Sequence, residues 1–244
     1  MNATKALFGK QISDFLKNMS VTIMFVMFPV IAFFMTTFME GADAAFNVLN
    51  FTAMFIGMGP LVYVANTIAE DNEHKNLRFL IMAGVKPFQY LGGIISFAVI
   101  MCIPGMLAFW WMIDATVAQL PLFLLIGLAG CLASSMLGAT VGLFAKNVQQ
   151  CSAIYTPLMM VMAFTPMVAM FNPDLAVVVD FVFTRQIMLA LFQMSPAVYE
   201  MADFMAEIAF LPVTLPVSLG IIGGSVLAFI IVFFAAYRKK GLKG

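Results

Sequence analysis

Six stretches of the sequence lack any charged side chain for 22 residues or more, and they limit what the chain can fold into. A helix rises 1.5 Å per residue, so about 20 apolar residues cross the hydrocarbon core of a bilayer. Charged residues make up only 10% of the chain, whereas soluble domains carry about 25%. The six stretches are Asn18–Met39, Ala44–Ala69, Pro87–Ile113, Ala115–Ala145, Asn147–Pro173 and Ile208–Tyr237.

We therefore predict an all-α membrane protein with six transmembrane helices in a single transmembrane domain, residues 1–244. The predicted spans cover about residues 20–39, 46–68, 88–112, 119–144, 150–171 and 210–236. Between the fifth and sixth spans, the longest uncharged run is Gln186–Tyr199, with 14 residues. That run is too short to span a bilayer, so residues 174–207 are predicted to form an extracellular re-entrant hairpin.

The basic residues lie almost entirely on one side of these spans. With the N-terminus inside, 11 of the 12 Lys and Arg residues fall in the inner segments, and only Arg185 falls outside them. The outer segments hold eight acidic residues, and we expect two of these, Asp114 and Asp180, at or beyond the outer surface. This positive-inside bias predicts a plasma-membrane protein with both termini in the cytoplasm.

Residues 4–19, before the first span, have the periodicity of an amphipathic helix. At 100° per residue their apolar side chains share one face, opposite Lys10 and Lys17. The pattern predicts a helix lying on the inner membrane surface, although a basic flank that only fixes the topology is an alternative. The face is formed by Phe8, Ile12, Phe15 and Leu16.

The segment between the second and third spans is the longest polar stretch on the inner side. Its acidic residues precede its basic ones, the order that suits a helix dipole, and Gly84 and Pro87 provide an end. We predict a short cytoplasmic helix that docks on a partner through charged and apolar side chains. The candidate contact residues are Glu70, Asp71, Glu73, His74, Leu77, Arg78, Leu80 and Ile81.

Small residues recur at every fourth position of the fourth span, at Gly130, Ser134, Gly138 and Gly142. This spacing lets another helix approach closely, so it predicts helix packing within one subunit or between subunits.

Several kinds of functional residue are absent from the sequence, and their absence limits the functions that the chain can have. No ionisable residue sits in the middle of a span, which argues against a proton- or sodium-coupled carrier. No phosphate-binding loop of the Gly-x-x-x-x-Gly-Lys-Ser/Thr type occurs, so any energy from ATP must come from another polypeptide. The three cysteines and the single histidine have no metal-ligand spacing. We predict no catalytic site, no metal, no cofactor in this chain and no nucleic-acid partner.

Three motifs resemble those of a known family. The run Ile68–Ile81 followed by Gly84-Val85-Lys86-Pro87 resembles its loop after span two, although Lys75-Asn76 replaces a Gly-Thr pair and the proline comes late. Gly142–Cys151 with Pro157-Leu158 is similar to its joint between spans four and five, and Phe171–Asp174 to the start of its outer hairpin. On these motifs, the chain resembles the ABC-2 type exporter permeases, the membrane subunits of ATP-binding-cassette exporters.

The resemblance implies a complex of two permeases, the second a copy or a paralogue, with two cytoplasmic ATPase subunits that hold ATP and Mg. The loop Glu70–Gly84 would then be the coupling helix, and the exporter would move a lipophilic or amphipathic substrate such as a peptide antibiotic, a drug or a lipid. Two alternatives stay open. One is a stand-alone secondary transporter or channel, and the other is a membrane immunity or assembly factor without turnover.

Overall fold

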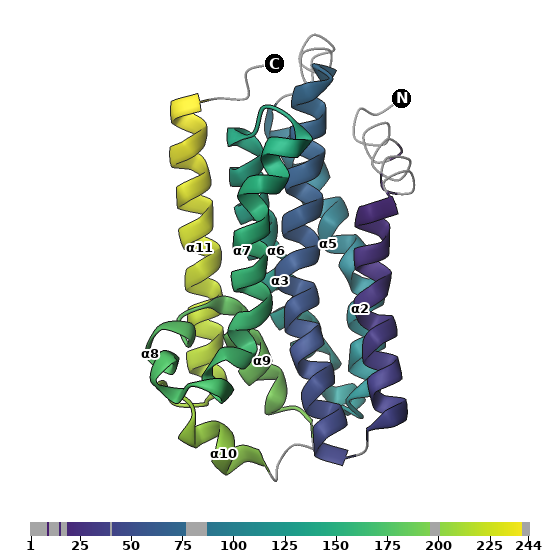
Figure 1. Ribbon diagram of the computed structural model, residues 1–244, viewed down its shortest axis with the longest axis vertical. Helices are drawn as coiled ribbons and strands as arrows, with labels where there is room; N and C mark the ends of the chain where they lie inside the picture. The colour runs from purple at the N-terminus through teal and green to yellow at the C-terminus, as the bar shows by residue number, and fades with distance from the viewer. Residues whose placement is uncertain are drawn as a thin grey trace.

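Long helices dominate the structure. The computed structural model describes residues 9, 15, 19–39, 41–76, 87–195 and 201–240, and every element within them is a helix (Figure 1). The six long ones are α2 (Met19–Phe38), α3 (Gly41–Glu73), α5 (Pro87–Met112), α6 (Leu120–Phe144), α7 (Val148–Phe171) and α11 (Leu215–Lys240). The short ones are η1 (Val117–Gln119), η2 (Pro173–Leu175), α8 (Ala176–Val179), α9 (Phe183–Phe192) and α10 (Ala202–Glu207).

Five of the long helices are long and apolar enough to cross a membrane, namely α3, α5, α6 together with η1, α7 and α11. The apolar part of α2, Thr22–Phe38, is shorter, but the helix lies where the first span was predicted. The segment Pro173–Phe192, which we call the hairpin, bends by 110° between Val179 and Phe183, as in a broken span or a re-entrant loop. The prediction of an all-helical membrane protein is confirmed.

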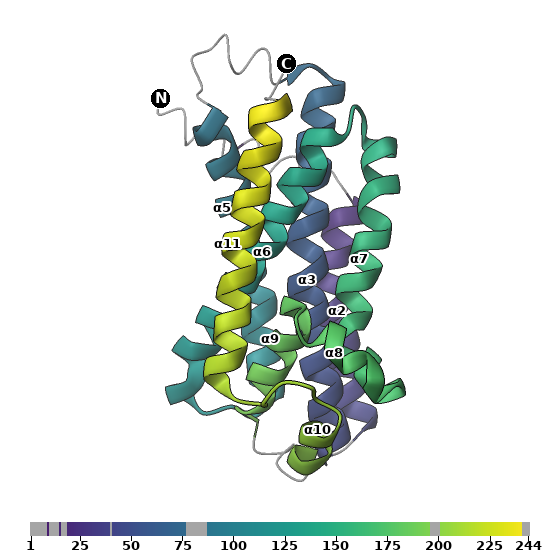
Figure 2. The same cartoon turned by 90° about the vertical axis from the view of Figure 1, so that its left-hand side faces the viewer.

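The long helices run up and down, so their ends form two opposite poles (Figures 1 and 2). One pole, the basic end, holds the end of α3, the turn between α6 and α7, and the end of α11, with Lys75, Lys146, Arg238 and Lys239. The other, the hairpin end, holds α8, α10 and the turns after α2 and α5, with Asp43, Asp114, Asp174 and Asp203.

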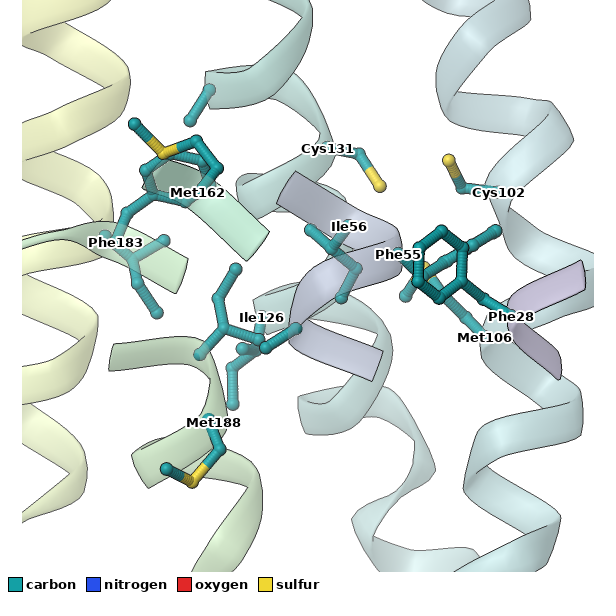
Figure 3. Close-up of a cluster of buried hydrophobic side chains, with 14 of the residues drawn as sticks. Phe28, Phe55, Ile56, Cys102, Met106, Ile126, Cys131, Met162, Phe183 and Met188 are labelled. Atoms are coloured by element: carbon teal, nitrogen blue, oxygen red, sulfur yellow. The ribbon is translucent and has the colours of Figure 1, made fainter. Parts of the chain in front are cut away.

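Helix α3 forms the centre of the bundle. It contacts α2, α5, α6, α7 and α9. In the most apolar 18-residue stretch of α3, 83% of the residues are buried, whereas only 17% are buried in the corresponding stretch of α11. Near its middle, Phe55 lies beside Phe28 of α2 and Met106 of α5, while Ile56 points toward α6 (Figure 3). Because α3 touches four of the other five long helices as well as α9, a shift of this helix would be felt across most of the bundle.

The small residues of α6 lie against α3. A Cβ atom at Gly138 would meet the backbone carbonyl of Leu61 inside van der Waals distance, and one at Gly142 would lie 2.8 Å from Ile68 Cβ. One turn before Gly138, the Ser134 hydroxyl donates a hydrogen bond of 2.7 Å to the Ile56 carbonyl. The stripe therefore brings the backbones of the two helices into close contact.

Two predicted spans have different limits in the structure. Helix α3 runs from Gly41 to Glu73 rather than over 46–68, because charges such as Asp43 and Glu70 mark the edge of the apolar region without ending a helix. Helix α11 begins at Leu215 and not at residue 210. The Phe210 and Leu211 amides donate to a carboxylate, and Pro216 stands at the second helical position, where its missing N–H costs nothing.

Replacing Gly138 with Ala tests the contact between α3 and α6. The added methyl group has no room beside the Leu61 backbone, so we expect a loss of about 1–3 kcal/mol in unfolding free energy. Gly220→Ala in α11 is the matched control, because nothing lies within 4 Å of its Cβ position; it should leave stability unchanged or raise it by up to about 1 kcal/mol, the helix propensity of Ala over Gly. Equal effects in a detergent unfolding assay would contradict this packing.

Candidate functional site

The predicted contact residues begin in the last turn of α3. No glycine or proline interrupts Leu61–Glu73, so the helix continues through Glu70, Asp71 and Glu73 instead of ending before them. It closes in a turn at Lys75, whose φ of 57° is left-handed. Three acidic candidates therefore belong to the central helix itself, not to a separate helix. Four others, Leu77, Arg78, Leu80 and Ile81, lie outside the described residues.

Asp71 connects α3 to α5. Its side chain is only 2% exposed, and Oδ2 accepts a hydrogen bond of 2.7 Å from the Tyr90 hydroxyl. Its other oxygen accepts from Asn76 Nδ2 at 3.2 Å. A buried carboxylate must be satisfied in this way, since an unpaired one would be costly. Asp71 thus acts inside the chain, where it fixes the start of α5 against the end of α3.

The next two residues hold the turn between α6 and α7. Asn72 Nδ2 donates to the carbonyls of Gly142 and Ala145, at 3.3 and 3.4 Å. Glu73 Oε2 accepts from the Val148 amide at 2.9 Å. That amide is the first of α7, where the helix dipole favours a negative charge. The end of α3 is therefore bonded to α6 and α7 as well as to α5.

Further hydrogen bonds join α3 to α7 inside the bundle. Asn66 Nδ2 donates to the Tyr155 hydroxyl at 3.3 Å, and that hydroxyl lies 3.1 Å from Ser152 Oγ. The Cys151 thiol, one turn before Tyr155 in α7, donates to the Ala65 carbonyl at 3.3 Å. These contacts extend the connection between the two helices beyond the terminal turn.

Three candidate side chains face outward at the basic end. Glu70, Glu73 and His74 are exposed, and His74 Nδ1 lies 3.0 Å from the Glu70 carbonyl. They stand on a helix end that is bonded to three neighbours, so they offer a charged surface on a rigid support. Of the four predicted contact residues that the structure describes, these three are exposed.

Of the predicted N-terminal helix, only Phe15 among the four apolar candidates is described. Its ring is buried and packs edge-on against Phe25, Tyr63 and Phe97 at centroid distances of 5.4–6.1 Å. Its carbonyl accepts a hydrogen bond of 2.6 Å from the Thr22 hydroxyl. Phe15 therefore anchors the segment before α2 to the protein core. Phe8, Ile12 and Leu16 lie outside the described residues.

A second polar cluster lies in the hairpin. Asp180, which was expected at or beyond the outer membrane surface, is fully buried within the protein, and its Oδ1 pairs with Arg185 Nε at 3.4 Å. Its Oδ2 accepts from the amides of Phe210 and Leu211 at 2.8 and 3.0 Å. One signal in the sequence could have revealed the pair: Arg185 is the lone basic residue on the acidic side.

The described residues offer no obvious place for a metal. Among them, no group of three or more His, Cys, Asp or Glu side chains is arranged to hold an ion. The three cysteines are all buried and free. The buried polar side chains described above join helices.

Tyr90→Phe tests whether Asp71 joins α3 to α5. Losing the hydroxyl leaves a buried carboxylate oxygen without that donor, so we expect a loss of about 1–3 kcal/mol in unfolding free energy. Tyr237→Phe at the same end is the control, since its hydroxyl has no hydrogen bond within the described residues; it should change stability by about 0.5 kcal/mol or less. Chemical unfolding in detergent micelles measures both, and indistinguishable variants would refute the connection.

Comparison with known proteins gives the context of this arrangement. The family described as ABC-2 family transporter protein matches residues 40–237. No curated protein shows a significant match to the chain. The matched region includes α3, α5, α6, α7, the hairpin and most of α11, and with them both polar clusters. The chain therefore belongs to the ABC-2 transporter family and is a multi-pass membrane protein of the permease type.

Proposed function

We propose that this chain is the permease subunit of an ATP-driven exporter, which moves a lipophilic or amphipathic substrate out of the cell. Permeases of this family generally work with separate ATP-binding-cassette ATPase subunits. In the proposed complex, two permeases, copies or paralogues, associate with two such subunits, and these bind ATP and Mg. The observation that carries the proposal is the end of α3, where exposed charges stand on a helix bonded to α5, α6 and α7.

The contacts at the end of α3 suggest how a movement of the ATPase would be transmitted to the membrane helices. A subunit seated on Glu70, Glu73 and His74 would push or turn the end of α3. Asp71 would carry the motion to α5 through Tyr90, and Asn72 and Glu73 would carry it to the α6–α7 turn. Packed helices respond to such a displacement as bodies and not by local bending. The charged residues on the end of α3 thus control four spans.

The charge distribution supports an orientation for the proposal. The basic end carries Lys75, Lys146, Arg238 and Lys239, so it should face the cytoplasm of a plasma-membrane protein. The hairpin end then faces outward, and the bend of 110° fits a re-entrant segment that enters and leaves from the outside. A cytoplasmic basic end places Glu70 and His74 where an ATPase can reach them.

Loss of the exposed side chains should weaken the capture of the ATPase. The double variant Glu70→Ala and His74→Ala removes two outward-facing groups without touching the bonds of Asp71, Asn72 or Glu73. We expect about tenfold less of an ATPase with a phosphate-binding loop to co-purify in mild detergent, measured by quantitative mass spectrometry. Glu207→Ala, an exposed acid at the opposite end, is the control and should leave the yield unchanged.

Two outcomes of that experiment would count against the proposed function. One is equal ATPase recovery with the double variant. The other is that no such ATPase accompanies the unmodified chain while the purified chain alone moves solute down or against an ion gradient in vesicles. The latter would favour the stand-alone transporter or channel.

Cysteine labelling from each side tests the orientation. Asp203→Cys, exposed at the hairpin end, should react with a membrane-impermeant maleimide in intact cells. Lys239→Cys, exposed at the basic end, should react only after the membrane is permeabilised. The reverse pattern would overturn the orientation and with it the docking surface.

A further inference from the structure

The hairpin is held in place by polar contacts that converge on its bend. Asp180 binds the linker before α11 through the Phe210 and Leu211 amides, and Arg185 Nη1 donates to the Pro166 carbonyl of α7 at 2.8 Å. Gln186 Nε2 donates to the Asp180 carbonyl, and its Oε1 accepts from the Ser218 hydroxyl of α11 at 2.8 Å. One bend is thus tied to three separate parts of the chain through buried side chains, those of Asp180, Arg185, Gln186 and Ser218.

These contacts are incomplete. Arg185 is 0% exposed, yet its Nη2 has no hydrogen-bond partner within the described residues, and it reaches Asp180 only through Nε at 3.4 Å. A buried ion pair with an unsatisfied donor holds a structure less firmly than an apolar contact of the same size. Water would satisfy Nη2 if the hairpin moved away from α7. The contacts of the bend are therefore specific, and one buried donor among them is left unsatisfied within the described residues.

The hairpin also rests directly on the central helix. A Cβ atom at Gly57 of α3 would lie 2.6 Å from Thr184 Cγ2, and one at Gly130 of α6 would collide with the side chain of Ile187. Helix α9 therefore packs directly against the backbone of α3 at Gly57 and of α6 at Gly130. The contact at Gly57 is on the same helix that ends in Asp71, Asn72 and Glu73. A displacement of α3 at the basic end would disturb this seat.

We propose that the hairpin is an outer gate, latched shut by the Asp180–Arg185 pair and released when α3 moves. Opening would break the bond from Arg185 to Pro166 and separate Thr184 from Gly57, so that the buried face of α9 meets water. Asp180 and Arg185 are then positioning residues for the transport cycle, and the driving of the gate by ATP rests on the proposed function.

The first test needs neither the ATPase nor a substrate. In the full chain with Cys102, Cys131 and Cys151 changed to Ala, Thr184→Cys reports on the buried face of α9. The Thr184 hydroxyl has no hydrogen-bond partner in the part of the chain that the structure describes, so the change removes no described hydrogen bond. Adding Arg185→Gln should speed labelling by a membrane-impermeant maleimide about tenfold in right-side-out vesicles. Arg238→Gln removes an exposed charge at the basic end and should change nothing.

A second reporter separates gate opening from general loosening. Ala98→Cys in α5 is 0% exposed and lies outside the hairpin, so it should stay unlabelled in the Arg185→Gln background. Faster labelling at 184 alone supports the latch. Faster labelling at both positions would reduce Arg185 to a structural role, and unchanged labelling at 184 would remove the latch; either result overturns the proposal.

The coupling to α3 is tested in the complex with the ATPase. With Arg185 intact, trapping the ATPase with ATP and vanadate should speed labelling of Thr184→Cys, while Ala98→Cys stays protected. No acceleration with the ATPase bound would overturn the gate while leaving the proposed function intact. Absence of a binding ATPase would instead refute the proposed function, and the vesicle experiment on Arg185→Gln would still decide on the latch.

Discussion

Close packing of α3 against α6 is the contact on which the rest of the bundle depends. Lipid tails are as apolar as leucine, so helices in a membrane gain little from the hydrophobic effect and associate through van der Waals contact instead. Gly138 and Gly142 let the two backbones touch, and Ser134 adds a hydrogen bond to Ile56. With α6 seated in this way, α3 is enclosed by α2, α5 and α7 as well.

This enclosure explains where the polar side chains lie. The middle of α3 has little room for charge, and its ionisable groups gather at Asp43 and at Glu70–Glu73. At the basic end, Asp71, Asn72 and Glu73 turn the helix terminus into a joint between four helices. Toward the hairpin end, α9 packs against Gly57 of α3, and Arg185 of α9 pairs with Asp180. A single helix thus joins the proposed ATPase-facing surface to the hairpin.

The sequence predicted the long helices well, because a run of uncharged residues long enough to cross the bilayer can be recognised from its length alone. The span predicted over 46–68 is shorter than α3, since Asp43 and Glu70 end the apolar zone but not the helix. The burial of Asp71 could not be predicted, because its partner Tyr90 is recognised only once the helices are assembled. For Asp180 the sequence held one signal, since its partner Arg185 is the lone basic residue on the acidic side. The helical periodicity of residues 4–19 likewise did not predict that Phe15 packs among Phe25, Tyr63 and Phe97.

The central claim is that α3 transmits motion from the basic end to the hairpin. Hydrogen–deuterium exchange tests it most directly, on the chain in lipid nanodiscs with the ATPase bound, before and after trapping with ATP and vanadate. The account predicts that exchange changes together at residues 70–76 and at residues 173–192, which no described hydrogen bond joins directly. A change confined to residues 70–76, with the hairpin equally protected in both states, would contradict it.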